Sequence, residues 1–449
     1  MALCFKMIPL KLDVLLNLYT QIAPGGLFRL LQRNLGLRKR TGVYTVRVVL
    51  WMMMAQRLHR GGSLADVVDQ LTTGVFDGVL SRCKRAREHR ISGATGGYCQ
   101  ARQNLPKVMV ERSVDEIVQR LQNRLSQRSP NQPPVYVLDG SSLQLEASAE
   151  LKERYPPAPN QHGPSHWPML RIVVLHDVET GLAQKPCWGP MYGSGAVSEQ
   201  ALATRAMDVL PTGAIIIGDR NFGIFGMAWA IHQRGHHPVI RLTAERAQRL
   251  AGGPIGEEGE YAVQWRASRW DQVNREERPA DAVLEGRLIA ARVGRGKSKK
   301  WLFVFTTAQL SGEQVMALYR ERWKIETDLR SLKQTAHLRR VAVRSCDMLE
   351  KELLTAVLAY NLVRGLMVEA AQRAHVDPRQ LSFTRAYNLV EIGIDRMLRA
   401  GSTEEQERIM ERIVQEIGRR LLPHRQNRRS YPRAVWGRGE TYPAHKKTK

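Results

Sequence analysis

The sequence predicts an α/β fold, in which a sheet covered on both faces is flanked by helical N- and C-terminal regions. Short, continuous apolar runs, typical of strands buried on both faces, alternate with stretches of helical spacing through the middle of the chain. Before about residue 125, and again over 348–371 and 381–399, apolar residues recur at helical spacing instead. A segment rich in Ser, Pro and Gln, 126–134, separates the two patterns and predicts a linker. The strand-like runs are residues 135–138, 170–175, 214–218, 239–242 and 301–305.

The pattern divides the chain into five segments. Residues 245–300 interrupt the α/β rhythm, because they are rich in Gly, Arg and Glu and alternate polar with apolar residues over 261–265 and 284–293. We therefore expect an inserted β subdomain there. The expected segments are a helical N-terminal region (1–130), the first part of the core (131–244), the inserted β subdomain (245–300), the second part of the core (301–373) and a helical C-terminal region with a basic tail (374–449).

The charge balance favours a polyanionic partner. The 449-residue chain carries 68 Lys and Arg against 43 Asp and Glu, a formal net charge of +25, which favours nucleic acid ahead of an acidic membrane surface. Its five cysteines form no Cys-x2-Cys pair, so we expect neither a disulfide framework nor a structural zinc site. The N-terminus lacks the pattern of a signal peptide, and the longest apolar run, 48–55, is too short to span a bilayer. We expect a cytoplasmic protein with no membrane partner.

The N-terminal region, 1–130, contains a pattern that resembles a helix-turn-helix. Residues 46–58 have helical spacing, a Gly turn follows, and Ser63 is suited to cap a second helix over 64–71. Any αα-hairpin has this pattern, so the basic run 82–90 is the feature that favours a DNA-binding role for the region. A solvated helix face is the alternative interpretation of that run.

Two aspartates follow strand-like runs. Asp139 comes after 135–138 and Asp219 after 214–218. Functional side chains collect at strand ends in α/β sheets, so the two carboxylates can converge if the strands are neighbours. A single Asp in such a place is more often only a turn residue.

A glutamate lies within a basic stretch at 319–333. Tyr319, Arg322, Glu326 and Lys333 are spaced by 3, 4 and 7 residues. At about 100° per residue they project at about 0°, 300°, 340° and 320°, so one helix would carry all four on one stripe. An ordinary i,i+4 ion pair between Arg322 and Glu326 is the alternative.

Together these residues predict a metal-dependent phosphate site. Three carboxylates, Asp139, Asp219 and Glu326, without Cys or His form an all-oxygen ligand set that suits Mg²⁺ or Mn²⁺. Two such ions about 4 Å apart can activate a nucleophile and stabilise the leaving oxygen of a phosphodiester. The guanidinium, ammonium and phenol groups beside the carboxylates suit DNA phosphate. The expected phosphate-binding residues are Tyr319, Arg322, Lys333 and Arg220, although Arg220 could instead be only an ion-pair partner of its neighbour.

The motifs around these residues resemble those of one family. The sequence is similar to the DDE transposases of bacterial insertion sequences, in the group with the Tyr-x2-Arg-x3-Glu-x6-Lys signature, the insertion-sequence-four family. The resemblance extends over about residues 40–400. It implies an RNase H-like core with an inserted β subdomain, and it implies that Asp139, Asp219 and Glu326 are the catalytic, metal-binding triad. The matching segments are residues 138–141, 218–223 and 319–333, with 98–102 and 359–364.

The resemblance also implies an activity and its partners. The family cuts at transposon ends with metal-activated water, forms a hairpin, and transfers the 3′-OH to target DNA. Double-stranded DNA with terminal inverted repeats, target DNA and a dimeric synaptic complex are the expected partners, in a bacterial cytoplasm at the nucleoid. The alternatives are a structure-specific nuclease on the same RNase H-like fold and a catalytically silent DNA-binding inhibitor of transposition.

A hairpin requires that a base leave the stack, and an aromatic side chain could receive it. Trp301, which follows a run of lysines, is the expected stacking residue, with a core tryptophan at a strand start as the alternative. Trp323 projects at about 40°, away from the stripe, and is interpreted as packing against the sheet.

Overall fold

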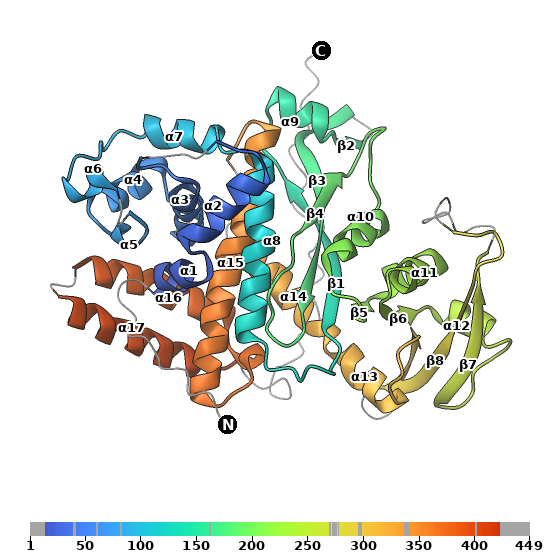
Figure 1. The fold of residues 1–449 in the computed structure, drawn as a ribbon. Coiled ribbons are helices and arrows are strands. Elements are labelled where there is room, and N and C mark those ends of the chain that lie inside the picture. The colour runs from blue at the N-terminus through green and yellow to red at the C-terminus, as the bar shows by residue number, and fades with distance from the viewer. Residues whose placement is uncertain are drawn as a thin grey trace, which may run out of the picture.

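A helical half and a sheet half lie side by side in the computed structural model (Figure 1). In the helical half, N-terminal helices and C-terminal helices pack around the same long helix, α15. The basic tail beyond residue 422, Arg82 and Lys297 lie outside the described residues. The structure describes residues 14–38, 42–59, 62–80, 83–160, 163–268, 271, 276, 278–294, 299–335, 342–399 and 402–422.

The strands form one mixed sheet. Over the described residues it has nine strands in the order β2-β3-β1-β5-β6-β9-β8-β7, with β4 paired to β3. The β1, β5 and β6 strands are parallel to one another, and the other pairings are antiparallel. The strands are β1 (Val135–Gln144), β2 (Pro157–Asn160), β3 (Gly163–Asp177), β4 (Cys187–Pro190), β5 (Ile215–Gly218), β6 (His237–Leu242), β7 (Gly259–Arg266), β8 (Val283–Val293) and β9 (Lys300–Thr306).

Each face of the sheet has its own apolar core, because side chains alternate between the faces along every strand. Leu138 and Ile216 point into the core beneath α10, α11 and α12. Val137 and Ile217 point into the core beneath α13 and α14, which is continuous with the helical half. The predicted α/β sheet with two covered faces is therefore confirmed. The helices of this half are α9 (Ala149–Arg154), α10 (Glu199–Ala206), α11 (Phe225–Gln233), α12 (Ala244–Leu250), α13 (Gly312–Arg320) and α14 (Arg322–Arg330).

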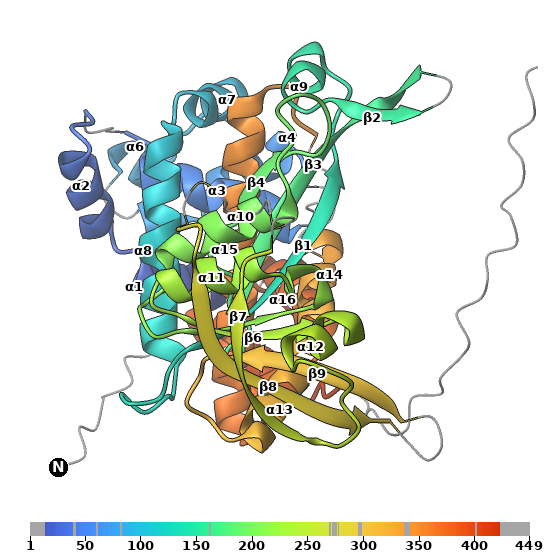
Figure 2. The same cartoon turned by 90° about the vertical axis from the view of Figure 1, so that its right-hand side faces the viewer.

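The segment 245–300 contributes the end of α12 and the hairpin of β7 and β8. The alternating stretches 261–265 and 284–293 lie in these two strands, as predicted. Because β8 pairs with β9 over residues 287–293, the hairpin extends the edge of the main sheet (Figure 2).

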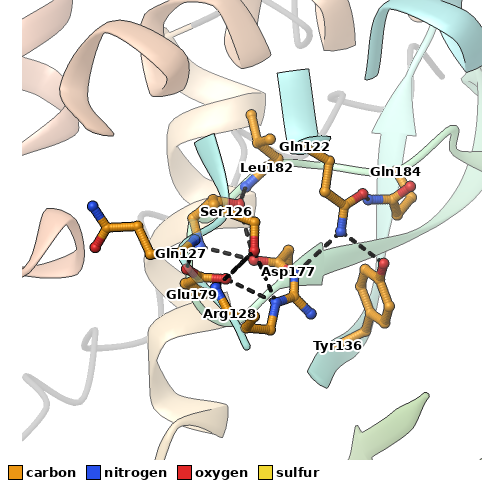
Figure 3. Close-up of polar contacts among 10 residues, drawn as sticks. Gln122, Ser126, Gln127, Arg128, Tyr136, Asp177, Glu179, Leu182 and Gln184 are labelled. Atoms are coloured by element: carbon orange, nitrogen blue, oxygen red, sulfur yellow. Dashed lines mark hydrogen bonds and ion pairs between the residues drawn. The ribbon is translucent and has the colours of Figure 1, made fainter. Parts of the chain in front are cut away.

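The predicted linker, 126–134, is fixed to the sheet by a polar network (Figure 3). Arg128 reaches Asp177, which is 0% exposed, at 2.5 Å, and its Nε donates to Glu179 at 2.8 Å. Gln122 donates to the Tyr136 hydroxyl at 2.8 Å. The start of β1 and the end of β3 are thereby held to the end of α8.

The helix α15 organises the helical half. It is the one helix in the described part of the chain that is long and apolar enough to cross a membrane, but 94% of its apolar window is buried inside the protein, as in a core helix. The predicted helices over 46–58 and 64–71 are confirmed, and Ser63 forms a capping box with Asp66. The helices around α15 (Cys346–Ala374) are α1 (Val14–Ile22), α2 (Gly25–Asn34), α3 (Val46–Leu58), α4 (Leu64–Thr72), α5 (Asp77–Leu80), α6 (Lys84–Arg87), α7 (Gly96–Gln103), α8 (Lys107–Leu125), α16 (Phe383–Arg399) and α17 (Thr403–Gly418).

A buried carboxylate on α15 ties it to two N-terminal helices. Glu352 accepts from Arg57 Nε of α3 at 3.0 Å and pairs with Arg102 of α7 at 3.2 Å. The side chain of Glu352 is only 4% exposed, so it is a buried counter-charge for both guanidinium groups.

We predict that Glu352→Gln lowers the free energy of unfolding by about 3–5 kcal/mol, because it removes a buried negative charge that pairs with two guanidinium groups. Glu350→Gln is the matched control on the same helix: Glu350 pairs with Lys107, whose side chain is 42% exposed, so its loss should cost less than about 1 kcal/mol. Urea denaturation measures both values, and equal losses would contradict the assignment.

Candidate active site

Asp139 lies within a strand rather than after one. It is the fifth of ten residues in β1, because β1 continues to Gln144 by pairing with β3, as in the pair Asp139 and Val174. The prediction that the strand ends before Asp139 is therefore wrong. The parallel pairing of β1 with β5 ends at the pair Val137 and Ile217. Continued by two residues, this register places Asp139 level with Asp219, which follows β5.

Asp219 follows β5 directly, as predicted, and caps a short 3-10 turn, Arg220–Phe222. Its Oδ1 accepts from the backbone N of Asn221 at 2.7 Å. The turn lies tightly against β6, where a Cβ on Gly223 would lie 2.1 Å from the Arg241 carbonyl oxygen. The backbone that carries Asp219 is therefore fixed.

The predicted helix over 311–333 is interrupted at Glu321. Ser311 caps α13 with a capping box to Gln314, as expected. At Glu321 the backbone N donates to Leu318 O, an i→i−3 bond of 3-10 type, after which α14 begins and leads into a π-helical turn, Ser331–Thr335. The prediction of one uninterrupted helix is therefore wrong.

Helix α14, which carries Glu326, packs on β1, the strand of Asp139. The Glu326 carboxylate, whose side chain is 47% exposed, pairs with Arg322 Nη2 at 3.6 Å. Lys333 donates to the Ser141 hydroxyl at 2.7 Å, two residues beyond Asp139 on the same face of β1. Among the described residues no three His, Cys, Asp or Glu side chains lie close enough to share one metal ion.

The carboxylates at this edge repel one another. The pKa of Asp139 is raised to about 7, first by burial and then by the charges of Asp219 and Glu199, against the Gly140 hydrogen bond and the Arg322 guanidinium. Burial and then Asp219 also raise the pKa of Glu199 above its ordinary range. Carboxylate oxygens that lie close together repel one another, and binding to a hard divalent cation neutralises this repulsion.

The other predicted phosphate-binding residues differ in how far their side chains are exposed. Tyr319 is 4% exposed, and burial raises the pKa of its phenol. The Nε of Arg322 is buried with no hydrogen-bond partner among the described residues. Arg220 is exposed, and in the described part of the chain no ion pair joins it to Asp219.

Trp301 and Trp323 differ in burial. Trp301, at the start of β9, is half-buried on the α10 side of the sheet, stacked on Phe303 with ring centroids 5.7 Å apart and with Arg292 4.7 Å from its centroid. Trp323 is 48% exposed, so the interpretation that it packs against the sheet is wrong. The projected direction of Trp323 assumed one uninterrupted helix over 311–333, whereas the structure has two helices that meet at Glu321.

Two residues at the site were not predicted. Asp328 is 1% exposed and pairs with Arg364 of α15 and with Arg379 at 2.6 Å. Burial would raise its pKa, but the guanidinium groups of Arg379 and Arg364 outweigh burial and hold the pKa below its usual range. Glu199, the first residue of α10, was missed because an acid in the first turn of a helix is common.

The structure is a mixed α/β sheet with two aspartates level on neighbouring strands, and comparison with known proteins gives the family. A family model described as "Transposase DDE domain" matches residues 130–362, more than half of the chain, so this protein belongs to the DDE transposases. The chain is also 25% identical to the transposase InsG for insertion sequence element IS4 of Escherichia coli (strain K12), over 422 residues that cover 91% of this chain and 88% of the relative. The resemblance to insertion-sequence transposases is confirmed.

We predict that Asp139→Asn stabilises the metal-free protein at high pH. A pKa raised from 3.8 to about 7 means that the fold favours the protonated acid, so ionisation destabilises the fold progressively as pH rises from about 4 to about 7. At pH 8 with EDTA, the free energy of unfolding should rise by on the order of 2–4 kcal/mol, and at pH 4 it should not change.

Urea denaturation at the two pH values measures this difference. Asp69→Asn, at an exposed position on α4, is the matched control and should show no pH-dependent gain. An equal effect of Asp139→Asn at both pH values would contradict the cause assigned to the pKa shift.

Proposed function

We propose that this protein is an active cut-and-paste transposase, which hydrolyses the phosphodiester at transposon ends and transfers the freed 3′-OH into target DNA. The observation that carries the proposal is the pair of aspartates, Asp139 and Asp219, on neighbouring parallel strands. Their mutual repulsion is part of the cause that raises the pKa of Asp139 to about 7, and a bound divalent cation would relieve it.

Asp139, Asp219 and Glu326 would hold Mg²⁺ or Mn²⁺. The bound ions supply Lewis-acid activation of water or of the 3′-OH, and stabilisation of the leaving oxygen. Glu326 would join the aspartates by leaving its pair with Arg322, which a 3.6 Å contact on a half-exposed side chain permits.

The basic side chains would hold the scissile strand. Arg322 has a buried Nε with no partner among the described residues, a donor suited to a phosphate oxygen. Lys333 would bring a point charge beside Ser141, and exposed Arg220 would contact DNA from the other side of Asp219. Tyr319, buried behind Arg322, would reach DNA only through a change in its neighbours.

The rest of the chain would position the DNA. We assign strands β4-β3-β1-β5-β6 to an RNase H-like core in the two segments 131–244 and 301–373, and the hairpin of β7 and β8 to the inserted subdomain. The N-terminal region, 1–130, would bind the terminal inverted repeats, and the C-terminal region, 374–449, would form a dimer in the synaptic complex at the bacterial nucleoid. The net charge of +25 supports DNA as the partner.

We predict that Glu326→Ala lowers Mg²⁺-dependent cleavage of transposon-end DNA by about 10³-fold or more while leaving DNA binding intact, because it removes one ligand of the triad. Cleavage of labelled duplex and a gel-shift assay measure the two quantities. Glu313→Ala, at an exposed position on α13, is the matched control.

Three outcomes decide between the candidate functions. Cleavage by Glu326→Ala at the wild-type rate would remove Glu326 from the site. Wild-type cleavage that ignores the terminal repeat would favour a structure-specific nuclease, and a wild-type protein that binds but never cuts would favour a silent inhibitor.

A hairpin intermediate would need a partner for the displaced base, and Trp301 is our proposed residue. We predict that Trp301→Ala lowers hairpin formation while leaving the first nick unchanged, since stacking contributes about 1–3 kcal/mol per base. Trp323→Ala is the comparison, because Trp323 is exposed and has Arg322 at 4.7 Å from its ring. Hairpin yield unchanged in Trp301→Ala but lost in Trp323→Ala would transfer the role to Trp323.

A further inference from the structure

Glu199 approaches the candidate site from the face of the sheet opposite α14. It is the first residue of α10, whose N-cap, Ser198, accepts from Ala201 N at 3.0 Å. Helix α10 packs on β3 and β4, in the core on the other side of the sheet from Asp139. Glu199 therefore does not belong to the stripe of residues on α13 and α14.

The carboxylate of Glu199 reaches the segment that carries Asp219. Its Oε2 accepts from Asn221 Nδ2 at 2.7 Å, and the backbone N of Asn221 donates to Asp219 Oδ1 at 2.7 Å. The next residue, Gln200, donates to the Asn221 carbonyl oxygen at 3.1 Å. Two side chains from the first turn of α10 thus hold the residue that orients Asp219.

The same carboxylate lies against the segment that carries Asp139. A Cβ placed on Gly140 would be 2.0 Å from Glu199 Oε1, so the carboxylate fills the space that a side chain at this position would need. The backbone N of Gly140 in turn donates to Asp139 Oδ1 at 2.9 Å. The Glu199 side chain therefore contacts Gly140, the residue after Asp139, and the side chain of Asn221, two residues after Asp219.

An ordinary role at a helix N-terminus does not account for this position. Glu245 provides the comparison, since it lies in the first turn of α12 after an N-cap threonine, is 83% exposed, and pairs with Arg249 of its own helix at 2.8 Å. Glu199 instead turns its charge toward Asp219, where repulsion opposes it, and gains the hydrogen bond from Asn221.

We propose that Glu199 is a positioning residue, which fixes the spacing of Asp139 and Asp219 through Gly140 and Asn221 and thereby sets the affinity of the site for divalent cations. This inference rests on the proposed function, because it acts on the same site. Loss of a residue that orients metal ligands typically weakens metal affinity by about 10–100-fold.

The test is Mn²⁺ binding to the full-length protein, measured from the loss of the free Mn²⁺ signal in electron paramagnetic resonance. Glu199→Ala should weaken Mn²⁺ binding by about 10–100-fold. Glu199→Gln keeps an acceptor for Asn221 Nδ2 and should remain within about threefold of wild type. Glu245→Ala is the matched control and should bind as wild type does.

Two results would overturn the inference. If Glu199→Ala binds Mn²⁺ as tightly as wild type, the residue does not position the ligands. If Glu199→Gln binds Mn²⁺ as weakly as Glu199→Ala, the negative charge of Glu199 acts on the ion, and its hydrogen bond from Asn221 does not set the affinity.

Two further variants keep the result interpretable. Asn221→Ala removes the other end of the hydrogen bond, and should match Glu199→Ala without adding to it in the double variant, even if Glu199→Ala folds poorly. Asp219→Ala should abolish Mn²⁺ binding. If Asp219→Ala binds Mn²⁺ as wild type does, the proposed site itself is overturned. If Asp219→Ala loses Mn²⁺ binding but Glu199→Ala keeps it, only the role of Glu199 is overturned.

Discussion

The burial of α15 is the constraint on which the rest of this structure depends. Its side chains join three parts of the molecule that are distant in sequence. Glu352 holds the N-terminal helices, and Asn361 makes two hydrogen bonds of 2.8 Å with the backbone of Ala183 beyond β3. Arg364 pairs with Asp328, two residues after Glu326. Since Glu352, Asn361 and Arg364 are buried, a shift of α15 would separate all three from these partners. The candidate site is therefore built on a frame with one preferred arrangement.

Within that frame, the register of β1 determines which residues meet. Parallel pairing with β5 brings Asp139 level with Asp219, and antiparallel pairing with β3 carries β1 onward, so that Ser141 meets Lys333. A slip of one residue would turn Asp139 to the α10 side of the sheet. The polar network of Arg128 and Asp177 at the start of β1 opposes such a slip, because a displaced strand would leave a fully buried carboxylate without its guanidinium.

The sequence predicted the parts of this site that depend on local pattern and missed those that depend on packing. Helical spacing and strand-like runs predicted most elements, whereas the predicted stripe on one uninterrupted helix is divided between α13, α14 and a π-helical turn. The continuation of β1 past Asp139 could not be predicted, because residues 140–142 are Gly, Ser and Ser and gain their strand conformation from pairing with β3. The break at Glu321 could not be predicted either, because helical periodicity does not detect a single 3-10 turn. Trp323 is exposed because it lies about 200° around α14 from buried Ile325. Glu199 was hidden because its partners, Gly140 and Asn221, are distant in sequence and one of them offers only a backbone.

The same packing explains how a fold can hold negative charges together without a cation. Burial and repulsion raise the pKa of Asp139 to about 7, so near neutral pH a proton neutralises part of the carboxylate cluster. Glu199 contacts the segments that carry both aspartates, and on the other face of the sheet Asp328 pairs with two arginines. A divalent cation held by Asp139 and Asp219 would relieve that repulsion, and Glu326 would complete the proposed ligand set by leaving its pair with Arg322. The affinity for such an ion would therefore depend on the contacts that hold the two segments carrying the aspartates.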